Sequence, residues 1–276
     1  VVGLCVDVAP ARALVVSDAS FSVAGGEVIG IVGESGAGKS IMLRALLGLL
    51  PKSVTIRGGK VWLAGEDILA LGARERAALR GRTIGFVPQE PLTALNPLYT
   101  IGRQVRETLA AVSPVPRKHI PGRALELLEQ VGLKDVEHVA RQYPHELSGG
   151  MRQRVMIAIA LAGEPRVILC DEPTTALDAT VQARVLDLLR TLATDRQLAI
   201  VLVTHDLSVV ARICQQIAVM YAGRVVERGP ALDVLANPTH PYTEALLRAV
   251  PLGTDVTELY TICLLYTSDA ADDLTR

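Results

Sequence analysis

A chain of 276 residues, half of them hydrophobic, can bury a sizeable core as one large domain or two small ones. Its formal net charge of −1 provides no overall basic surface, so we expect no nucleic-acid partner. The most apolar stretches, 41–50 and 155–162, are interrupted by Arg44 or too short to span a bilayer. Any membrane association is therefore expected to occur through a partner.

The first sixty-odd residues predict short strands joined by tight turns. The predicted strands cover residues 4–8, 19–23 and 60–63, and the turns include Ala24-Gly25-Gly26 and Ala64-Gly65. This pattern favours a small antiparallel β layer beside the core.

Most of the chain alternates short β-branched runs with helical patterns, which favours an α/β fold with a mainly parallel core sheet under helices. The strands predicted for that sheet are 28–32, 84–87, 167–170, 199–204 and 216–220. The charged cluster at 74–82 is interpreted as a solvated helix face.

Strand signals are absent between residues about 90 and 165, where helices are predicted instead. The predicted helices are 101–111, 123–131 and 151–162, and the proline-rich segment 113–121 separates the first two. This stretch is interpreted as an inserted helical subdomain.

A glycine-rich loop lies between the strand 28–32 and a helix predicted at 41–50. Glycines let such a loop wrap closely around phosphate oxygens, while its lysine faces the β- and γ-phosphates and its serine hydroxyl can ligate Mg²⁺. The loop therefore predicts a nucleotide site with Mg²⁺. Its residues are Gly33, Glu34, Ser35, Gly36, Ala37, Gly38, Lys39 and Ser40.

Two carboxylates, Asp171 and Glu172, follow the apolar run 167–170. A buried strand of this kind delivers charge to its C-terminal end, where ligands of parallel sheets bind. Asp171 suits the Mg²⁺ shell, and Glu172 suits accepting a proton from an attacking water or orienting it.

A second glycine-bearing turn, Ser148-Gly149-Gly150, opens the helix predicted at 151–162. Backbone N–H groups at such a helix start are free to bind phosphate. The chain thus carries two different candidate phosphate-binding turns.

In combination these motifs resemble the ATP-binding subunits of ABC transporters, over residues 1–253. The glycine loop matches the Walker A motif, residues 147–153 the LSGG signature, and 167–172 Walker B. Three single residues complete the resemblance: Gln89 of the Q-loop, Asp178 of the D-loop and His205 of the H-loop.

The resemblance implies a role for each of these residues and a dimer of ATPase subunits, identical or different. Gln89 would touch Mg²⁺ and the attacking water, and His205 the γ-phosphate of ATP. Asp178 would face the opposing subunit. Ser148, Gly149 and Gly150 would complete a site whose Lys39 and Glu172 belong to the other chain.

A narrower resemblance is to the oligopeptide, dipeptide and nickel importer branch, through residues 89–97, 143–154 and 237–243. It implies integral membrane permease subunits, a substrate-binding protein reached indirectly, and a peripheral position on the cytoplasmic face of the inner membrane. An apolar ledge after Gln89 could receive a helix of the permease, or could equally pack as a loop between subdomains. The ledge comprises Pro91, Leu92, Leu95, Pro97 and Leu98.

Two departures from the family concern the ends of the chain. Relatives often stack an aromatic ring on adenine near the N-terminus, whereas residues 1–20 contain none and Val8 is the nearest candidate. Residues 263–276 resemble translated sequencing-library adaptor, after a C-terminal extension that would start at 254–262. We infer no iron–sulfur cluster from Cys263, and the absence of an initiator Met suggests an incomplete start.

The cysteines Cys5, Cys170, Cys214 and Cys263 lack metal-site spacing, and no signal peptide is visible, so free thiols in the cytosol are expected.

Three classes of function remain open. The first is the ATPase subunit of an importer, with peptide favoured over nickel. The second is a soluble ABC-type ATPase, although such proteins usually carry a coiled-coil insertion or two tandem cassettes. The third is a nucleotide sensor without catalysis, disfavoured because Lys39, Asp171, Glu172 and His205 are all present.

Overall fold

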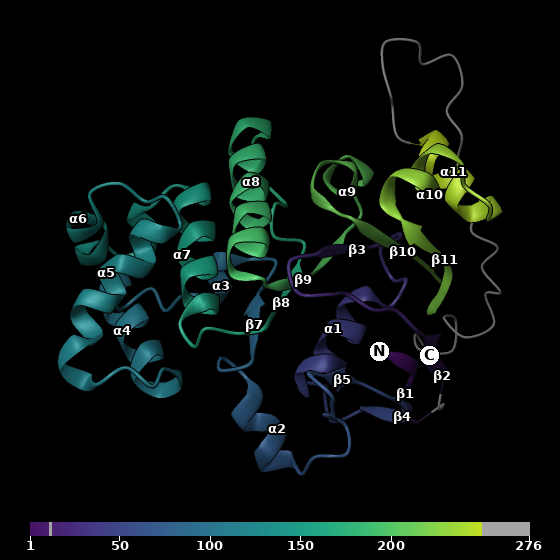
Figure 1. Cartoon of the computed structure of the whole chain (residues 1–276), viewed down its shortest axis with the longest axis horizontal. Helices are drawn as coiled ribbons and strands as arrows, with labels where there is room; N and C mark the ends of the chain where they lie inside the picture. The colour runs from purple at the N-terminus through teal and green to yellow at the C-terminus, as the bar shows by residue number, and fades with distance from the viewer. Residues whose placement is uncertain (11–12, 250–276) are drawn as a thin grey trace, which may run out of the picture.

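A computed structural model of the chain describes residues 1–10 and 13–249, and its centre is a six-stranded sheet (Figure 1). The strand order is β11-β10-β3-β9-β8-β7, and every pairing is parallel except that of β10 with β11. The strands are β3 (Val28–Val32), β7 (Ile84–Val87), β8 (Val167–Asp171), β9 (Ala199–Thr204), β10 (Gln216–Tyr221) and β11 (Arg224–Pro230). β3, β8 and β9 are buried along their whole length, as expected of continuous apolar runs in a parallel sheet. The predicted α/β class is confirmed, whereas β11 was not predicted.

The antiparallel layer is confirmed with different boundaries. Its strands β1 (Val2–Val8), β2 (Ala13–Ala19) and β4 (Val54–Lys60) pair in the order β2-β1-β4, and a short hairpin follows, β5 (Trp62–Leu63) with β6 (Glu66–Asp67). The strand predicted at 19–23 is wrong, because β2 ends at Ala19 and Phe21 is a buried loop residue. The strand predicted at 60–63 is divided between β4 and β5. At Phe21 the apolar residue marks burial of irregular backbone rather than a strand, whereas at 60–63 only the buried Val61, between β4 and β5, lies outside a strand.

Helix α1 (Lys39–Leu47) lies between the core sheet and the antiparallel layer. Its Met42, Leu43 and Leu46 belong to the same apolar cluster as residues of β1, β8 and β9. The helix ends three residues before its predicted end, because Gly48 takes a left-handed conformation and caps it.

The opposite face of the sheet is covered by α8 (Ala179–Arg196) and α9 (Leu207–Ile213), whose buried residues form one cluster with those of α7. Two short helices follow β11, α10 (Ala231–Ala236) and α11 (Pro241–Ala249), and α2 (Ala73–Leu79) lies before β7.

The segment predicted to be helical forms a group beyond the β7 edge of the sheet (Figure 1). It contains α3 (Pro91–Ala94), α4 (Ile101–Val112), α5 (Ile120–Gln130), α6 (Val136–Arg141) and α7 (Gly149–Leu161), with 3-10 turns Arg117–His119 and Pro144–Glu146. α5 begins at Ile120 rather than 123, because Pro121 occupies its first turn, where a proline is well tolerated. α7 begins at Gly149 rather than 151, because Ser148 is its N-cap.

Two further observations concern the described residues alone. None of their helices combines the length and apolarity needed to cross a bilayer. Their cysteines, Cys5, Cys170 and Cys214, are free thiols, as predicted. Cys263 and the segments 254–262 and 263–276 lie outside the described residues.

Candidate functional site

The glycine-rich loop connects the end of β3 to the start of α1, with its lysine side chain turned back into the loop. Lys39 Nζ donates hydrogen bonds to the carbonyl oxygens of Gly33, at 2.6 Å, and Glu34, at 2.7 Å. Gly38 has a φ of 97°, and a Cβ there would lie 2.6 Å from the backbone oxygen of Val15. A side chain at that position would both strain the backbone and collide, so the loop requires glycine there.

The hydroxyl at the start of α1 meets the carboxylate at the end of β8. Ser40 Oγ donates to Asp171 Oδ1 at 2.9 Å. Burial raises the pKa of Asp171, and the hydrogen bond from Ser40 partly offsets this effect. Burial also lowers the pKa of Lys39, while the charges of Glu172 and Asp171 act in the opposite direction. A cation and an anion are thus held, partly desolvated, on adjacent elements.

Glu172 is the centre of a four-residue cluster at the C-terminal ends of β7, β8 and β9. Its Oε2 accepts hydrogen bonds from Gln89 Nε2 at 3.2 Å and Thr175 Oγ1 at 2.9 Å. Its Oε1 lies 3.1 Å from His205 Nδ1. The backbone at Glu172 is left-handed, with φ of 46°, which is unusual for a residue other than glycine. Strained backbone of this kind concentrates at functional sites.

Thr175 was not singled out from the sequence. It lies in the turn that follows Asp171-Glu172, and its backbone N–H also donates to the Glu172 carbonyl oxygen. A hydroxyl residue three positions after a strand-end carboxylate was the available signal, since such turns often bond back onto the preceding acid.

The residues of the second glycine turn do not join this cluster within the described chain. Ser148 Oγ accepts from Met151 N, and Asp178 Oδ1 accepts from Val181 N, so each side chain caps its own helix. Gly150 is packed so tightly against α8 that a Cβ would lie 2.3 Å from Val181 Cγ1. The turn at the start of α7 therefore packs against the start of α8, while Ser148 and Gly149 stay exposed on the surface.

A tyrosine from the far end of the chain reaches the glycine-rich loop, and sequence reasoning missed it. The backbone N–H of Glu34 donates to the hydroxyl of Tyr242, on α11, at 3.0 Å. Tyr242 lies in the segment 237–243, whose sequence resembles the importer branch but predicts no contact with the loop. Nothing local in that segment indicates contact with a loop 208 positions away.

The predicted apolar ledge is partly confirmed. Leu92 and Leu98 are 54% and 78% exposed, but Leu95 is buried in the core cluster and does not belong to the ledge. Val8, the nearest candidate for an adenine contact, is a half-buried residue of β1 paired with Ala13 and Val54.

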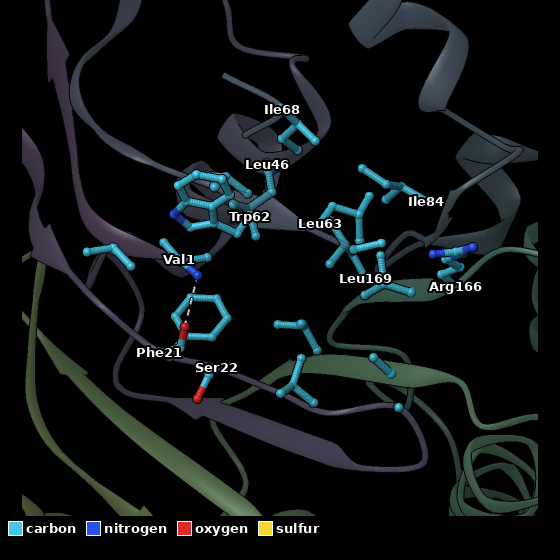
Figure 2. A pocket seen from close by; sticks show the side chains of 18 of the residues that line it. Val1, Phe21, Ser22, Leu46, Trp62, Leu63, Ile68, Ile84, Arg166 and Leu169 are labelled. Carbon is cyan, nitrogen blue, oxygen red and sulfur yellow. Dashed lines mark hydrogen bonds between the residues drawn. The ribbon is translucent and has the colours of Figure 1, made fainter. Parts of the chain in front are cut away.

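A mostly apolar cavity of about 880 Å³ lies elsewhere, between the antiparallel layer and the core sheet. Figure 2 shows Trp62, Leu63 and Leu169 around it, with Arg166 at one end. Its lining includes Val167 of β8 and Ala199 of β9, the first residues of those strands. It is therefore at the opposite end of the sheet from Asp171 and is not part of the site.

The oxygens at the site suit a small, hard cation. Among the described residues no three His, Cys, Asp or Glu side chains converge as a complete metal cage. Ser40 Oγ and Asp171 Oδ1, however, are oxygen donors on adjacent elements beside the loop. One or two protein oxygens completed by phosphate oxygens and water are the usual environment of Mg²⁺.

Two family profiles match the sequence. One, described as ABC transporter, covers residues 16–175. The other, described as oligopeptide/dipeptide transporter, C-terminal region, covers residues 226–263.

Curated relatives match most of the chain. It is 46% identical over 246 residues to the oligopeptide transport ATP-binding protein OppD of Lactococcus lactis subsp. cremoris, covering 89% of this chain and 73% of that one. It is 47% identical over 233 residues to a probable peptide ABC transporter ATP-binding protein of Sinorhizobium fredii, covering 84% and 70%.

Solved structures of ATP-binding cassettes match the fold. The cassette MJ0796, solved as a dimer in a post-hydrolysis state with ADP and Pi, superposes with a TM-score of 0.72 at 31% identity, covering 84% of this chain and 99% of that one. The cbiO1 subunit of an ABC transporter complex from Clostridium perfringens gives 0.73 at 27% identity, covering 86% and 91%.

Proposed function

The chain belongs to the ABC transporter family, among the ATP-binding subunits of its oligopeptide and dipeptide branch, and on this premise we propose that it hydrolyses ATP to power peptide import through separate membrane subunits. The observation that carries the proposal is the cluster in which Gln89, Thr175 and His205 surround the Glu172 carboxylate. The two curated relatives named above are described as ATP-binding proteins of oligopeptide or peptide transport, which favours peptide over nickel, and no observation favours a soluble ATPase or a sensor.

Nucleotide binding begins at the glycine-rich loop. Backbone N–H groups at the start of α1 point to the phosphates, and Lys39 exchanges its two carbonyl acceptors, Gly33 and Glu34, for phosphate oxygens. Ser40 and Asp171 would hold Mg²⁺, which would supply positive charge to neutralise the phosphates.

Hydrolysis is a direct attack of water on the γ-phosphorus. Glu172 accepts the water proton as the new P–O bond forms and the bond to the β-phosphate oxygen breaks, giving ADP and phosphate. Gln89 and Thr175 fix the Oε2 of Glu172 and thus aim its carboxylate, while His205 orients the γ-phosphate. Positioning and electrostatics carry such a reaction, with no covalent intermediate.

The active assembly is a dimer in which each site is shared, and it is bound to permease subunits at the cytoplasmic membrane face. Support comes from the exposure of Ser148 and Gly149, which make no contact with the nucleotide site within the part of the chain that the structure describes. The exposed ledge residues Leu92 and Leu98 follow Gln89 and are proposed to contact the permease. A substrate-binding protein delivers peptide on the other side.

The test is reconstitution with candidate permease subunits in liposomes. We expect ATP-dependent uptake of a labelled oligopeptide, with phosphate release stimulated by the peptide-loaded binding protein. Phosphate release without any uptake would refute coupling to transport, and the absence of both would refute the assignment as a whole.

A further inference from the structure

We infer that Tyr242 is a positioning residue for the glycine-rich loop, and that the segment 237–249 sets nucleotide affinity through it. This inference rests on the proposed function and deepens it. Its basis is the hydrogen bond from the Glu34 backbone N–H to the Tyr242 hydroxyl, together with the contacts that immobilise Tyr242.

The tyrosine ring is held beside the loop by the core sheet. Tyr242 is buried, and its ring lies against that of Tyr221, with centroids 4.3 Å apart. Tyr221 ends β10, which pairs with β3, the strand that leads into the loop. The ring of Tyr242 is therefore held by its contact with Tyr221 of the neighbouring strand, and this contact places the Tyr242 hydroxyl beside the loop.

The start of α11 is fixed by a buried carboxylate of β11. Glu227 Oε1 accepts from Thr239 N at 2.7 Å and Thr239 Oγ1 at 2.8 Å, and its Oε2 accepts from His240 N at 3.1 Å. His240 Nδ1 in turn accepts from Tyr242 N at 3.1 Å. Three bonds to one carboxylate tie the segment to the sheet and define where Tyr242 can reach.

Tyr242 and Lys39 both form hydrogen bonds with the backbone of Glu34. The Glu34 carbonyl accepts from Lys39 Nζ, while its N–H is bonded to Tyr242. When Lys39 turns to a phosphate it releases the carbonyls of Gly33 and Glu34. Two bonds of Glu34 do not depend on Lys39: its N–H still donates to Tyr242, and its carbonyl still accepts from the Ala37 N–H at 3.2 Å. The bond uses an amide at the loop entrance, so the amides at the start of α1 stay free for phosphate.

Without the hydroxyl, the Glu34 amide would lack its partner and the loop would sample conformations that satisfy it with water. The apparent affinity for nucleotide is the intrinsic affinity multiplied by the fraction of molecules whose loop is competent to bind, so it falls as that fraction falls. The bond is only part-buried, so its loss should cost the net worth of an ordinary hydrogen bond, about 0.5–1.5 kcal/mol, which corresponds to a loss of roughly 2- to 13-fold.

The experiment compares Tyr242→Phe with Tyr221→Phe by calorimetric titration of ATP, ADP and AMP in the presence of Mg²⁺. Both variants keep their rings, and no hydrogen bond of the Tyr221 hydroxyl is found among the described residues. We expect Tyr242→Phe to weaken the binding of ATP and of ADP by the same factor, within roughly 2- to 13-fold, and Tyr221→Phe to bind both as the wild type does. The KM for ATP should rise equally, while kcat at saturating ATP stays near wild type, because the bound loop is already ordered.

Glu227→Gln provides a second variant that leaves the tyrosine intact. It weakens the anchoring of Thr239 and His240, so we expect a smaller loss of ATP affinity in the same direction. A role in folding alone would lower the melting temperature and the active fraction, but not the Kd of the folded protein. Equal ATP affinity in Tyr242→Phe and wild type would overturn the inference. Wild-type protein that binds neither ATP nor ADP would overturn the proposed function, and this inference with it.

Discussion

His205 and Glu172 directly follow two neighbouring parallel strands, and Nδ1 of the imidazole lies 3.1 Å from Oε1 of the carboxylate. His205 follows the last residue of β9, and Glu172 follows the last residue of β8. The parallel pairing of these two strands therefore brings the two side chains together. The side chains differ in exposure, 16% for Glu172 and 59% for His205. The carboxylate is thus shielded and aimed, while the imidazole stays accessible to a ligand.

Replacing Glu172 by Gln should remove the base with little change in geometry. The amide oxygen of Gln can accept from Gln89 and Thr175, and its NH₂ can face His205 Nδ1. We expect hydrolysis to fall by about 10²- to 10⁴-fold while ATP affinity is retained. Phosphate release and equilibrium binding measure the two effects, with Glu129→Gln, an exposed acid on α5, as control. Normal turnover in Glu172→Gln would eliminate the carboxylate as base.

Replacing Asp171 by Asn should stabilise the ligand-free fold and abolish hydrolysis. Burial raises the pKa of Asp171 above its unfolded value, so the folded state binds the proton more tightly than the unfolded state. Stability contributed by the protonated acid is complete below the unfolded pKa and is lost as pH rises toward the folded pKa. Asn has no such dependence and can still accept the Ser40 bond.

Thermal melting of wild type and Asp171→Asn across pH checks this expectation. The variant's advantage should be small in acid, grow as pH rises through the two pKa values of Asp171, and then level off. An advantage that shrinks with rising pH would contradict the assigned cause.

Replacing Lys39 by Ala should weaken ATP and ADP binding strongly, because the loop loses its charge to the phosphates. It also loses the bonds to the Gly33 and Glu34 carbonyls. Lys39→Arg should not restore affinity, since the ammonium is buried and a guanidinium is larger and planar. Calorimetry should show wild-type affinity in the control Lys52→Ala, which alters an exposed loop residue. Unchanged ATP affinity in Lys39→Ala would count against the loop assignment.

The shared site can be tested by mixing two inactive variants. Ser148→Arg should block the turn presented to the partner and leave ATP binding by its own chain intact. The loss of the Ser148 helix cap should lower the free energy of unfolding by about 1 kcal/mol. A mixed dimer contains one Ser148→Arg chain and one Glu172→Gln chain. One of its two sites then carries both substitutions, and the other carries neither. We expect phosphate release to reappear on mixing. Persistent inactivity of verified mixed dimers would indicate that each chain completes its own site.

Charges on the ledge should uncouple the chain from its permease. Leu92→Asp with Leu98→Asp is expected to retain ATP binding but to abolish co-purification with membrane subunits, because a buried carboxylate at an interface is costly. Leu232→Asp is the matched control, since that leucine is 70% exposed on α10. Equal loss in the control would show that the effect is not specific to the ledge.

Features that depend on local pattern could be predicted from the sequence. The strands predicted at 28–32, 84–87 and 199–204 coincide with β3, β7 and β9, because a short apolar run that is rich in β-branched residues and bounded by turns has few other solutions. The glycine loop was located for the same reason, since its spacing, the preceding strand and the following helix are all continuous in the chain. The predicted strand boundaries were wrong where buried apolar residues lie in irregular backbone, as at Phe21.

Which distant side chains come into contact depends on the packing of the whole fold. Periodicity cannot separate the buried Leu95 from the exposed Leu92 and Leu98, because packing of the whole helical group sets which of them is covered. Nor can it place the Tyr242 hydroxyl on the Glu34 amide, 208 positions away, because that contact depends on how β10 pairs with β3 and how Glu227 fixes α11. Chemistry carried by neighbours in the chain is legible in the sequence, whereas contacts that cross the sheet are fixed by the packing of distant elements.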